Sequence, residues 1–209
     1  MYRRLTPAPS KIPPASTSLG LCAGLFQGVW LLVAAALTFL PVGTFEINRE
    51  ASRIEFLVKD NRGGFTGVVR DLTASAVVRE QGSSFIGDLQ VQIDARTMTT
   101  GVGVRDNQMR RDFLETDKFP FITFRGTIAP VDRVGALPFR SAMKGVLAIK
   151  QRTQEVEIPV RVTALRDTYL AEGQVTVKMS DFKIPIPRFL IFVAEDPVTI
   201  SFKVRFGQK

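Results

Sequence analysis

The chain has 209 residues, a formal net charge of +8 at pH 7, one cysteine and no histidine. Without histidine there is no Ser-His-Asp triad, no Cys-His pair, no HExxH zinc site and no imidazole acid or base. The length fits one ordinary domain together with a targeting segment.

Residues 1–41 read as a signal peptide or an N-terminal membrane anchor. Arg3, Arg4 and Lys11 precede an apolar run over residues 19–40, and no acidic residue occurs before Glu46. As a helix, this run would span roughly 33 Å, enough to cross a bilayer. Small residues at 34–36 equally permit cleavage by a signal peptidase. In both cases the positive-inside rule predicts that residues 42–209 form an exported domain.

Strands dominate the prediction from Phe45 onward because apolar residues recur at every second position. In chain order, this alternation predicts strands over residues 54–58, 65–79 and 89–93. After a polar interruption, it predicts strands over residues 121–128, 142–150, 156–162, 169–179 and 198–206. The fold class is therefore all-β: an antiparallel barrel of about eight strands.

One polar segment, residues 105–118, interrupts the strands and predicts a single short helix. An Asp near a helix start is typical of a cap, so Asp106 is expected to cap this helix. Arg105 would then tie the helix to the barrel.

The remaining charges indicate a solvated exterior. Arg3, Arg4 and Lys11 supply three of the eight net positive charges, and later basic residues such as Lys203 and Arg205 alternate with apolar ones on strand faces. Nucleic acid is not expected as a partner, because basic clusters interleaved with aromatic residues are missing.

No catalytic residue and no metal site are predicted. The carboxylates show no spacing that suits a metal or an acid pair, so we expect them to be solvated or paired with cations. They are Asp60, Asp71, Asp88, Asp94, Asp106 and Asp112.

The alternation leaves one question open. A barrel of about eight strands is either filled by side chains or holds one small ligand, and both cases use the same apolar residue types.

Several motifs from Phe45 to about Phe206 resemble those of the YceI-like polyisoprenoid-binding family, whose members are exported bacterial proteins with a lipocalin-like β-barrel. The first strand (residues 45–58) and the glycine-containing turn at residues 65–68 are similar to those of the family. So are a hairpin at residues 143–160 and the segment 179–184. The most specific block contains Thr100, Arg105-Asp106, Met109, Asp112-Phe113-Leu114 and residues 119–124.

The chain departs from the family pattern at three positions. Gln151 and Lys183 replace usual glycines, and Asp60 stands near a usual histidine. These departures leave the identity of the ligand and the contacts with its head group open, and they affect the expected fold less.

The resemblance implies a periplasmic protein, soluble or tethered to the inner membrane by residues 19–40, that encloses a long isoprenoid. Such a ligand would be a polyprenyl phosphate or an isoprenoid quinone, which the protein would carry or store. The isoprenoid is the expected partner, and no cofactor is expected. Strand parity gives the lumen candidates: Phe56, Leu89, Val91, Ile93, Val156, Ile158, Val160, Ile200, Phe202 and Val204.

The resemblance leaves the role of Arg105 and the presence of a ligand open. Arg105 either pairs with a phosphate or quinone oxygen at the barrel mouth or serves, with Asp106, to tether the helix. The alternative function is an exported stress or interaction module whose barrel is filled and holds no ligand. A third class, an enzyme that uses carboxylates, is disfavoured by the missing histidine and the missing acid pair, and the oligomeric state is not predicted.

Overall fold

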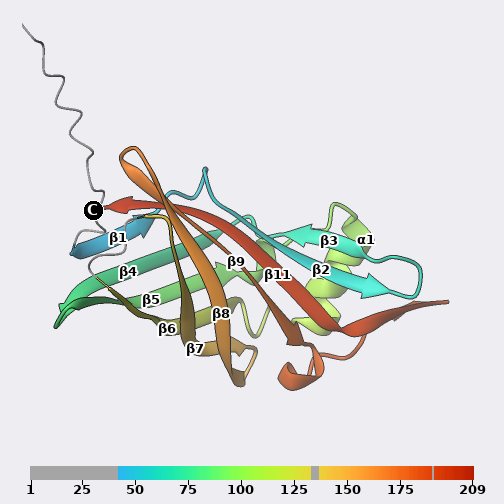
Figure 1. Ribbon diagram of the computed structural model, residues 1–209. Helices are drawn as coiled ribbons and strands as arrows, with labels where there is room; N and C mark the ends of the chain where they lie inside the picture. Colours follow the sequence, from blue (N-terminus) through green and yellow to red (C-terminus); the bar gives the residue numbers. More distant parts are fainter. Residues whose placement is uncertain (1–41, 133–136, 190) are drawn as a thin grey trace, which may run out of the picture. The chain divides into compact units, whose positions relative to one another are not determined.

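The computed structural model describes residues 42–132, 137–189 and 191–209 (Figure 1). The predicted signal or anchor helix at residues 19–40 lies outside these residues. No helix within the described ranges is long and apolar enough to cross a membrane.

The described residues form eleven strands, with the following bounds. The first five are β1 (Gly43–Ile47), β2 (Arg53–Asp60), β3 (Phe65–Val68), β4 (Leu72–Gln81) and β5 (Ser84–Asp94). The others are β6 (Phe121–Asp132), β7 (Phe139–Ile149), β8 (Arg152–Leu165), β9 (Thr168–Lys178), β10 (Arg188–Phe189) and β11 (Phe192–Gln208).

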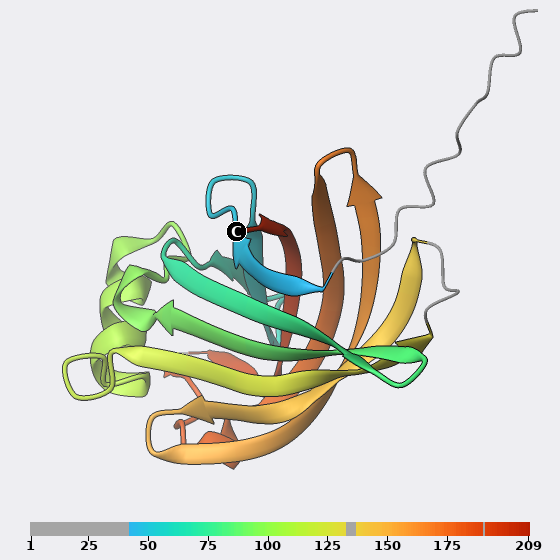
Figure 2. The same cartoon turned by 90° about the vertical axis from the view of Figure 1, so that its left-hand side faces the viewer.

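Eight of these strands close an antiparallel ring in the order β1-β4-β5-β6-β7-β8-β9-β11, with β11 returning to β1. Consecutive strands are neighbours nearly everywhere, so the barrel is an up-and-down meander (Figure 2). The predicted all-β barrel of about eight strands is confirmed.

β1 and β2 follow one another along the same edge of β11, with an interruption between them. β3 and β4 follow one another in the same way, β3 pairing with β2 and β4 with β1. β11 pairs with β2 along one stretch and with β1 further on, and the hydroxyl of Ser52 accepts the Arg205 amide (3.0 Å) at the interruption. Residues 65–79 were predicted as one strand, but they form β3 and β4 with a break at 69–71. There the amide of Asp71 is satisfied by the Thr97 hydroxyl (3.0 Å) instead of a strand partner.

The helical segment lies between β5 and β6 at one end of the barrel, which we call the helix end (Figure 1). It begins with the 3₁₀ turn η1 (Ala95–Thr97), continues as α1 (Gly103–Gln108) and ends in the π-helical turn η2 (Met109–Phe113). The antiparallel order also brings the β2–β3 turn, the β7–β8 turn and the 3₁₀ turn η3 (Ser180–Phe182) to this end. The β4–β5 and β8–β9 turns lie at the opposite end.

Candidate functional site

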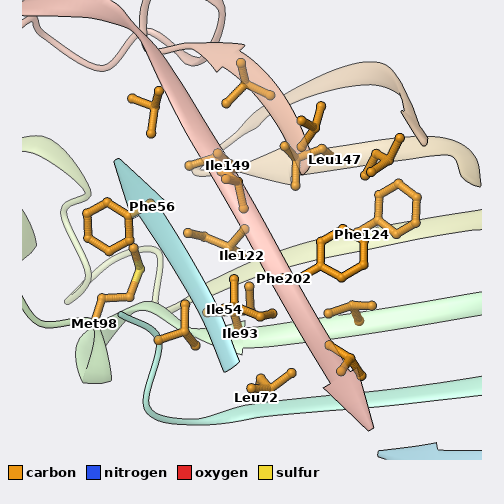
Figure 3. Close-up of a pocket in the computed structure, with 18 of the residues that line it drawn as sticks. Ile54, Phe56, Leu72, Ile93, Met98, Ile122, Phe124, Leu147, Ile149 and Phe202 are labelled. Atoms are coloured by element: carbon orange, nitrogen blue, oxygen red, sulfur yellow. The ribbon is translucent and has the colours of Figure 1, made fainter. Parts of the chain in front are cut away.

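The interior of the barrel is hollow. A cavity of about 820 Å³ runs along it, lined by residues from every strand of the closed ring and from α1 and η2. Figure 3 shows side chains of β2, β4, β5, β6, β7 and β11, together with Met98, converging on this space. Nearly all of the lining is aliphatic or aromatic, which is the surface expected for an apolar ligand.

The end opposite the helix is closed by aromatic packing. The ring of Phe45 stands edge-on to those of Tyr169 and Phe206, each at 5.8 Å between centroids, and Tyr169 stacks on Phe206 at 5.4 Å. Phe45 is almost fully buried in this cluster. The cavity therefore has a closed floor at this end.

The helix end is covered from outside by the helical segment. Met109, Phe113 and Leu114 of this segment line the cavity and pack against the buried core around Phe182. The start of α1 also borders the cavity, but Val104 there is 82% exposed. The cover is thus apolar inside and open to solvent near Val104.

Two glycines in the strands leave room for aromatic rings to pack directly on the backbone. A Cβ on Gly67 would lie 2.1 Å from the Phe56 ring, and a Cβ on Gly173 would lie 2.5 Å from the Phe202 ring. Each ring therefore packs on the neighbouring strand at a position where a Cβ would collide with it. A glycine within an apolar strand is the sequence signal for such close contact, although alternation alone does not reveal which ring it accommodates.

Nine of the ten predicted lumen residues line this cavity. They are Phe56, Leu89, Val91, Ile93, Ile158, Val160, Ile200, Phe202 and Val204. Val156 has the same strand parity and is partly buried against the core cluster, but it is not a lining residue of the cavity.

Asp106 does not cap α1 as predicted. It is a residue of the helix, only 5% exposed, and the N-cap position is Val102, which makes no side-chain cap bond. Instead, the carboxylate receives the amide (2.7 Å) and hydroxyl (2.6 Å) of Thr100 and the hydroxyl of Thr99 (2.6 Å). All three donors belong to the loop before α1, and none is an amide of the first turn of the helix. Asp106 therefore holds this loop in place and does not cap the helix.

These contacts also set the ionisation of Asp106. Burial opposes the charged form and is the largest single influence. The hydrogen bonds from Thr100 and Thr99, together with the charge of Arg110, outweigh it and hold the pKa of Asp106 below its usual value.

Arg105 links the helix to the barrel and also borders the cavity. Its Nε donates to the Thr100 hydroxyl (2.9 Å), and its guanidinium lies over the Phe65 ring at 4.1 Å from the centroid. Within the described part of the chain, neither Nη group has a hydrogen-bond partner. The geometry fits a tether, and it leaves the outer edge of the guanidinium available to a ligand.

Three other charged residues line the cavity: Asp60, Arg62 and Lys178. One oxygen of Asp60 accepts the backbone amide of Arg62 (2.8 Å), so the acid is engaged in its own turn. Arg105, Arg62 and Lys178 therefore outnumber the acidic residue at the lining. Among the described residues, no group of His, Cys, Asp and Glu is placed to hold a metal ion.

The segment 179–184 supplies part of the cavity wall. Asp196 accepts the amide (2.8 Å) and hydroxyl (2.6 Å) of Ser180, which holds η3 against β11. Lys183 then adopts a left-handed conformation, with φ at 53°, and turns the chain so that Phe182 and Ile184 are both buried. This backbone requirement explains why glycine suits the position of Lys183.

A closed eight-stranded meander around an apolar cavity defines a barrel of the class that encloses a small hydrophobic ligand. The chain belongs to the YceI-like family, since the model of the YceI-like domain matches residues 45–206. The comparison with curated proteins found no match.

Solved structures with the same fold include BcnA of Burkholderia cenocepacia. It is 20% identical, covers 76% of this chain and 98% of its own, and superposes with a TM-score of 0.64. A polyisoprenoid binding domain from Saccharophagus degradans is 16% identical, with coverages of 81% and 100% and a TM-score of 0.62. The YCEI protein of Campylobacter jejuni is 21% identical, with coverages of 68% and 84% and a TM-score of 0.55.

A matched pair of leucines tests whether the barrel is hollow in solution. Both leucines line the cavity, but Leu72 is 4% exposed whereas Leu89 is only partly buried. We expect Leu72→Ala to lower the free energy of unfolding by about 3–4 kcal/mol and Leu89→Ala by about 1–2 kcal/mol. Urea unfolding of the ligand-free protein measures both losses. Equal losses would show that Leu89 is packed as closely as Leu72, as in a barrel filled by side chains.

Proposed function

We propose that the protein binds one long isoprenoid lipid in its barrel and carries or stores it. The single observation that carries this proposal is the apolar cavity of about 820 Å³, which extends from the aromatic floor at Phe45 to the start of α1. An isoprenoid chain is flexible and apolar, so its burial at about 25 cal/mol per Å² would drive binding without any catalytic group. Membership of the YceI-like family and the likeness to a structure described as a polyisoprenoid binding domain support the same ligand class.

The nine lining residues among the predicted lumen set are proposed to contact the tail. Val156 is proposed to act only through packing. A hollow interior favours this function over the filled-barrel alternative, because a filled barrel would have no space of this size.

The head group is proposed to lie at the helix end. Arg105, Arg62 and Lys178 border the cavity there, and a phosphate or a quinone oxygen could accept hydrogen bonds from the free edge of Arg105. The ligand is therefore a polyprenyl phosphate or an isoprenoid quinone.

We further propose that residues 1–41 direct export and that residues 42–209 act in the periplasm. If residues 19–40 are retained as an anchor, the barrel stays beside the membrane that contains the lipid. Sequencing the N-terminus of the mature protein tests this: a start near Leu37 would rule out the anchor.

Uptake by the purified protein tests the binding function. We expect native mass spectrometry in mild detergent to show one long-chain quinone or one polyprenyl phosphate bound per chain, without a second lipid molecule. A polar dye of similar mass, added as a control, should not bind. Failure to bind either isoprenoid, with the fold intact, would favour the interaction module.

Replacing Arg105 separates its two roles. Since a charge-assisted hydrogen bond is worth about 1.5–3 kcal/mol, Arg105→Ala should weaken polyprenyl phosphate binding roughly 10- to 100-fold and quinone binding less. Thermal melting is measured in parallel. A variant that melts far lower but binds both lipids normally once folded would show that Arg105 is only a tether.

A further inference from the structure

Two exposed apolar segments stand beside the mouth of the cavity. At the start of α1, Val102 and Val104 are 48% and 82% exposed although both line the cavity. At the β10–β11 hairpin, Ile191 and Val193 are 57% and 40% exposed. Exposed apolar side chains that gather beside the opening of a cavity are typical of an interaction site.

The two segments belong to one rim. The side chain of Asn61 in the β2–β3 turn donates to the Ile191 carbonyl (2.8 Å), which joins that turn to the β10–β11 hairpin. On the other side, Arg105 packs on Phe65 at the start of β3, which joins the same turn to α1. Figure 1 shows α1, the β2–β3 turn and the start of β11 at the same end of the barrel. We define the mouth rim as residues 60–64, 102–105, 187, 188, 191 and 193.

The rim is positively charged. It contains Arg62, Arg105 and Arg188 and only one acidic residue, Asp60, whose carboxylate is engaged by the Arg62 amide. Exposed apolar side chains among cations complement a surface that is apolar beneath anionic head groups.

From these observations we propose that the mouth rim docks on an anionic lipid bilayer and that the isoprenoid passes between the bilayer and the barrel through this contact. The inference rests on the proposed function. A bilayer is favoured over a protein partner because the rim surrounds the opening of the cavity. An apolar ligand would otherwise have to cross water to reach that opening.

Site-specific fluorescence tests the docking. In the full-length chain with Cys22→Ser, single cysteines are introduced by Ile191→Cys and Val104→Cys on the rim. Matched controls are Val77→Cys and Val146→Cys, which are 41% and 40% exposed on the barrel wall. Each is labelled with an environment-sensitive dye and reconstituted with phosphatidylcholine vesicles, with or without an equal part of phosphatidylglycerol.

When phosphatidylglycerol is present, the emission of dyes at the rim positions is expected to shift to shorter wavelength and to be quenched by nitroxide lipids. Both responses should be smaller at high salt. The wall positions should not respond. Equal responses at rim and wall, or no response at the rim, would overturn the proposal.

A second variant distinguishes this proposal from the binding function itself. Ile191→Asp should slow the transfer of a long-chain quinone from phosphatidylglycerol vesicles at least tenfold while leaving quinone uptake from detergent unchanged. Unchanged transfer by Ile191→Asp would contradict the docking proposal and leave the binding function intact. Failure of the unmodified protein to take up quinone from detergent would contradict the binding function.

Discussion

Replacing Val91 by tryptophan is expected to abolish most of the isoprenoid binding without unfolding the barrel. Val91 lines the cavity, and its strand partners are Ala74 on β4 and Phe124 on β6. The small Ala74 cannot block the larger ring, so the ring extends into the cavity. Overpacking costs about 1–3 kcal/mol in a filled core, and the empty space reduces that cost here.

The loss of binding follows from the surface that the tryptophan displaces. If the ring removes roughly 100 Å² of contact with the tail, affinity falls by about 2.5 kcal/mol, or roughly 50- to 100-fold. Titration with a long-chain quinone in detergent, read by native mass spectrometry, measures the change.

Gln90→Trp is the matched control, because Gln90 is the preceding residue of β5 and its side chain is exposed on the outer face. Its affinity should stay within about twofold of the parent. Similar losses for both variants would place the ligand somewhere other than the lumen.

Asp106→Ala is expected to destabilise the barrel strongly. It leaves the Thr100 amide and the hydroxyls of Thr99 and Thr100 without the carboxylate that now accepts them. The three donors are partly buried, and the loss of their charged acceptor costs about 2–4 kcal/mol in total. For a domain of this size, that loss lowers the melting temperature by about 5–15 °C, which differential scanning calorimetry measures.

Asp112→Ala provides the control on the same helical segment. Among the described residues, Asp112 is exposed and pairs only with its exposed neighbour Arg111 (2.6 Å), so its loss should leave the melting temperature nearly unchanged. Comparable destabilisation by both variants would mean that the contacts of Asp106 with Thr99 and Thr100 stabilise the protein no more than an exposed ion pair does.

The same carboxylate makes stability depend on pH in a definite direction. Because the pKa of Asp106 is lower in the folded protein than in the unfolded chain, its contribution is complete above the unfolded value of about 3.9. The contribution is lost as the pH falls through the folded value. We therefore expect the stability difference between the parent and Asp106→Asn to be constant near neutral pH and to shrink below about pH 4. A constant difference down to about pH 2 would contradict this.

The sequence predicted the closed barrel because strand parity is a local property. Each clean alternation, such as Leu89, Val91 and Ile93 against Gln90 and Gln92, marks one apolar face, and eight such faces in succession close on one another. Parity identifies the inward face of a strand but not where along the strand the cavity ends: Val156 has the same parity as Ile158 and Val160 and does not line the cavity.

Two features depended on tertiary contacts that no local pattern encodes. The predicted role of Asp106 was wrong because its partners are set by how the loop at Thr99 and Thr100 folds back, although an Asp near a helix start usually acts as a cap. The hollow interior could not be read from composition, since a filled core uses the same residues. It depends on how the side chains pack together, as where Gly67 and Gly173 leave room for the rings of Phe56 and Phe202.

Lipid analysis of the protein purified from an exporting bacterial host tests the central claim most directly. Native mass spectrometry is combined with organic extraction, with Val91→Trp purified in parallel. The account predicts one isoprenoid per chain in the parent and a strongly reduced amount in the variant. A parent barrel that is empty after purification, and that also takes up no added quinone or polyprenyl phosphate, would contradict it.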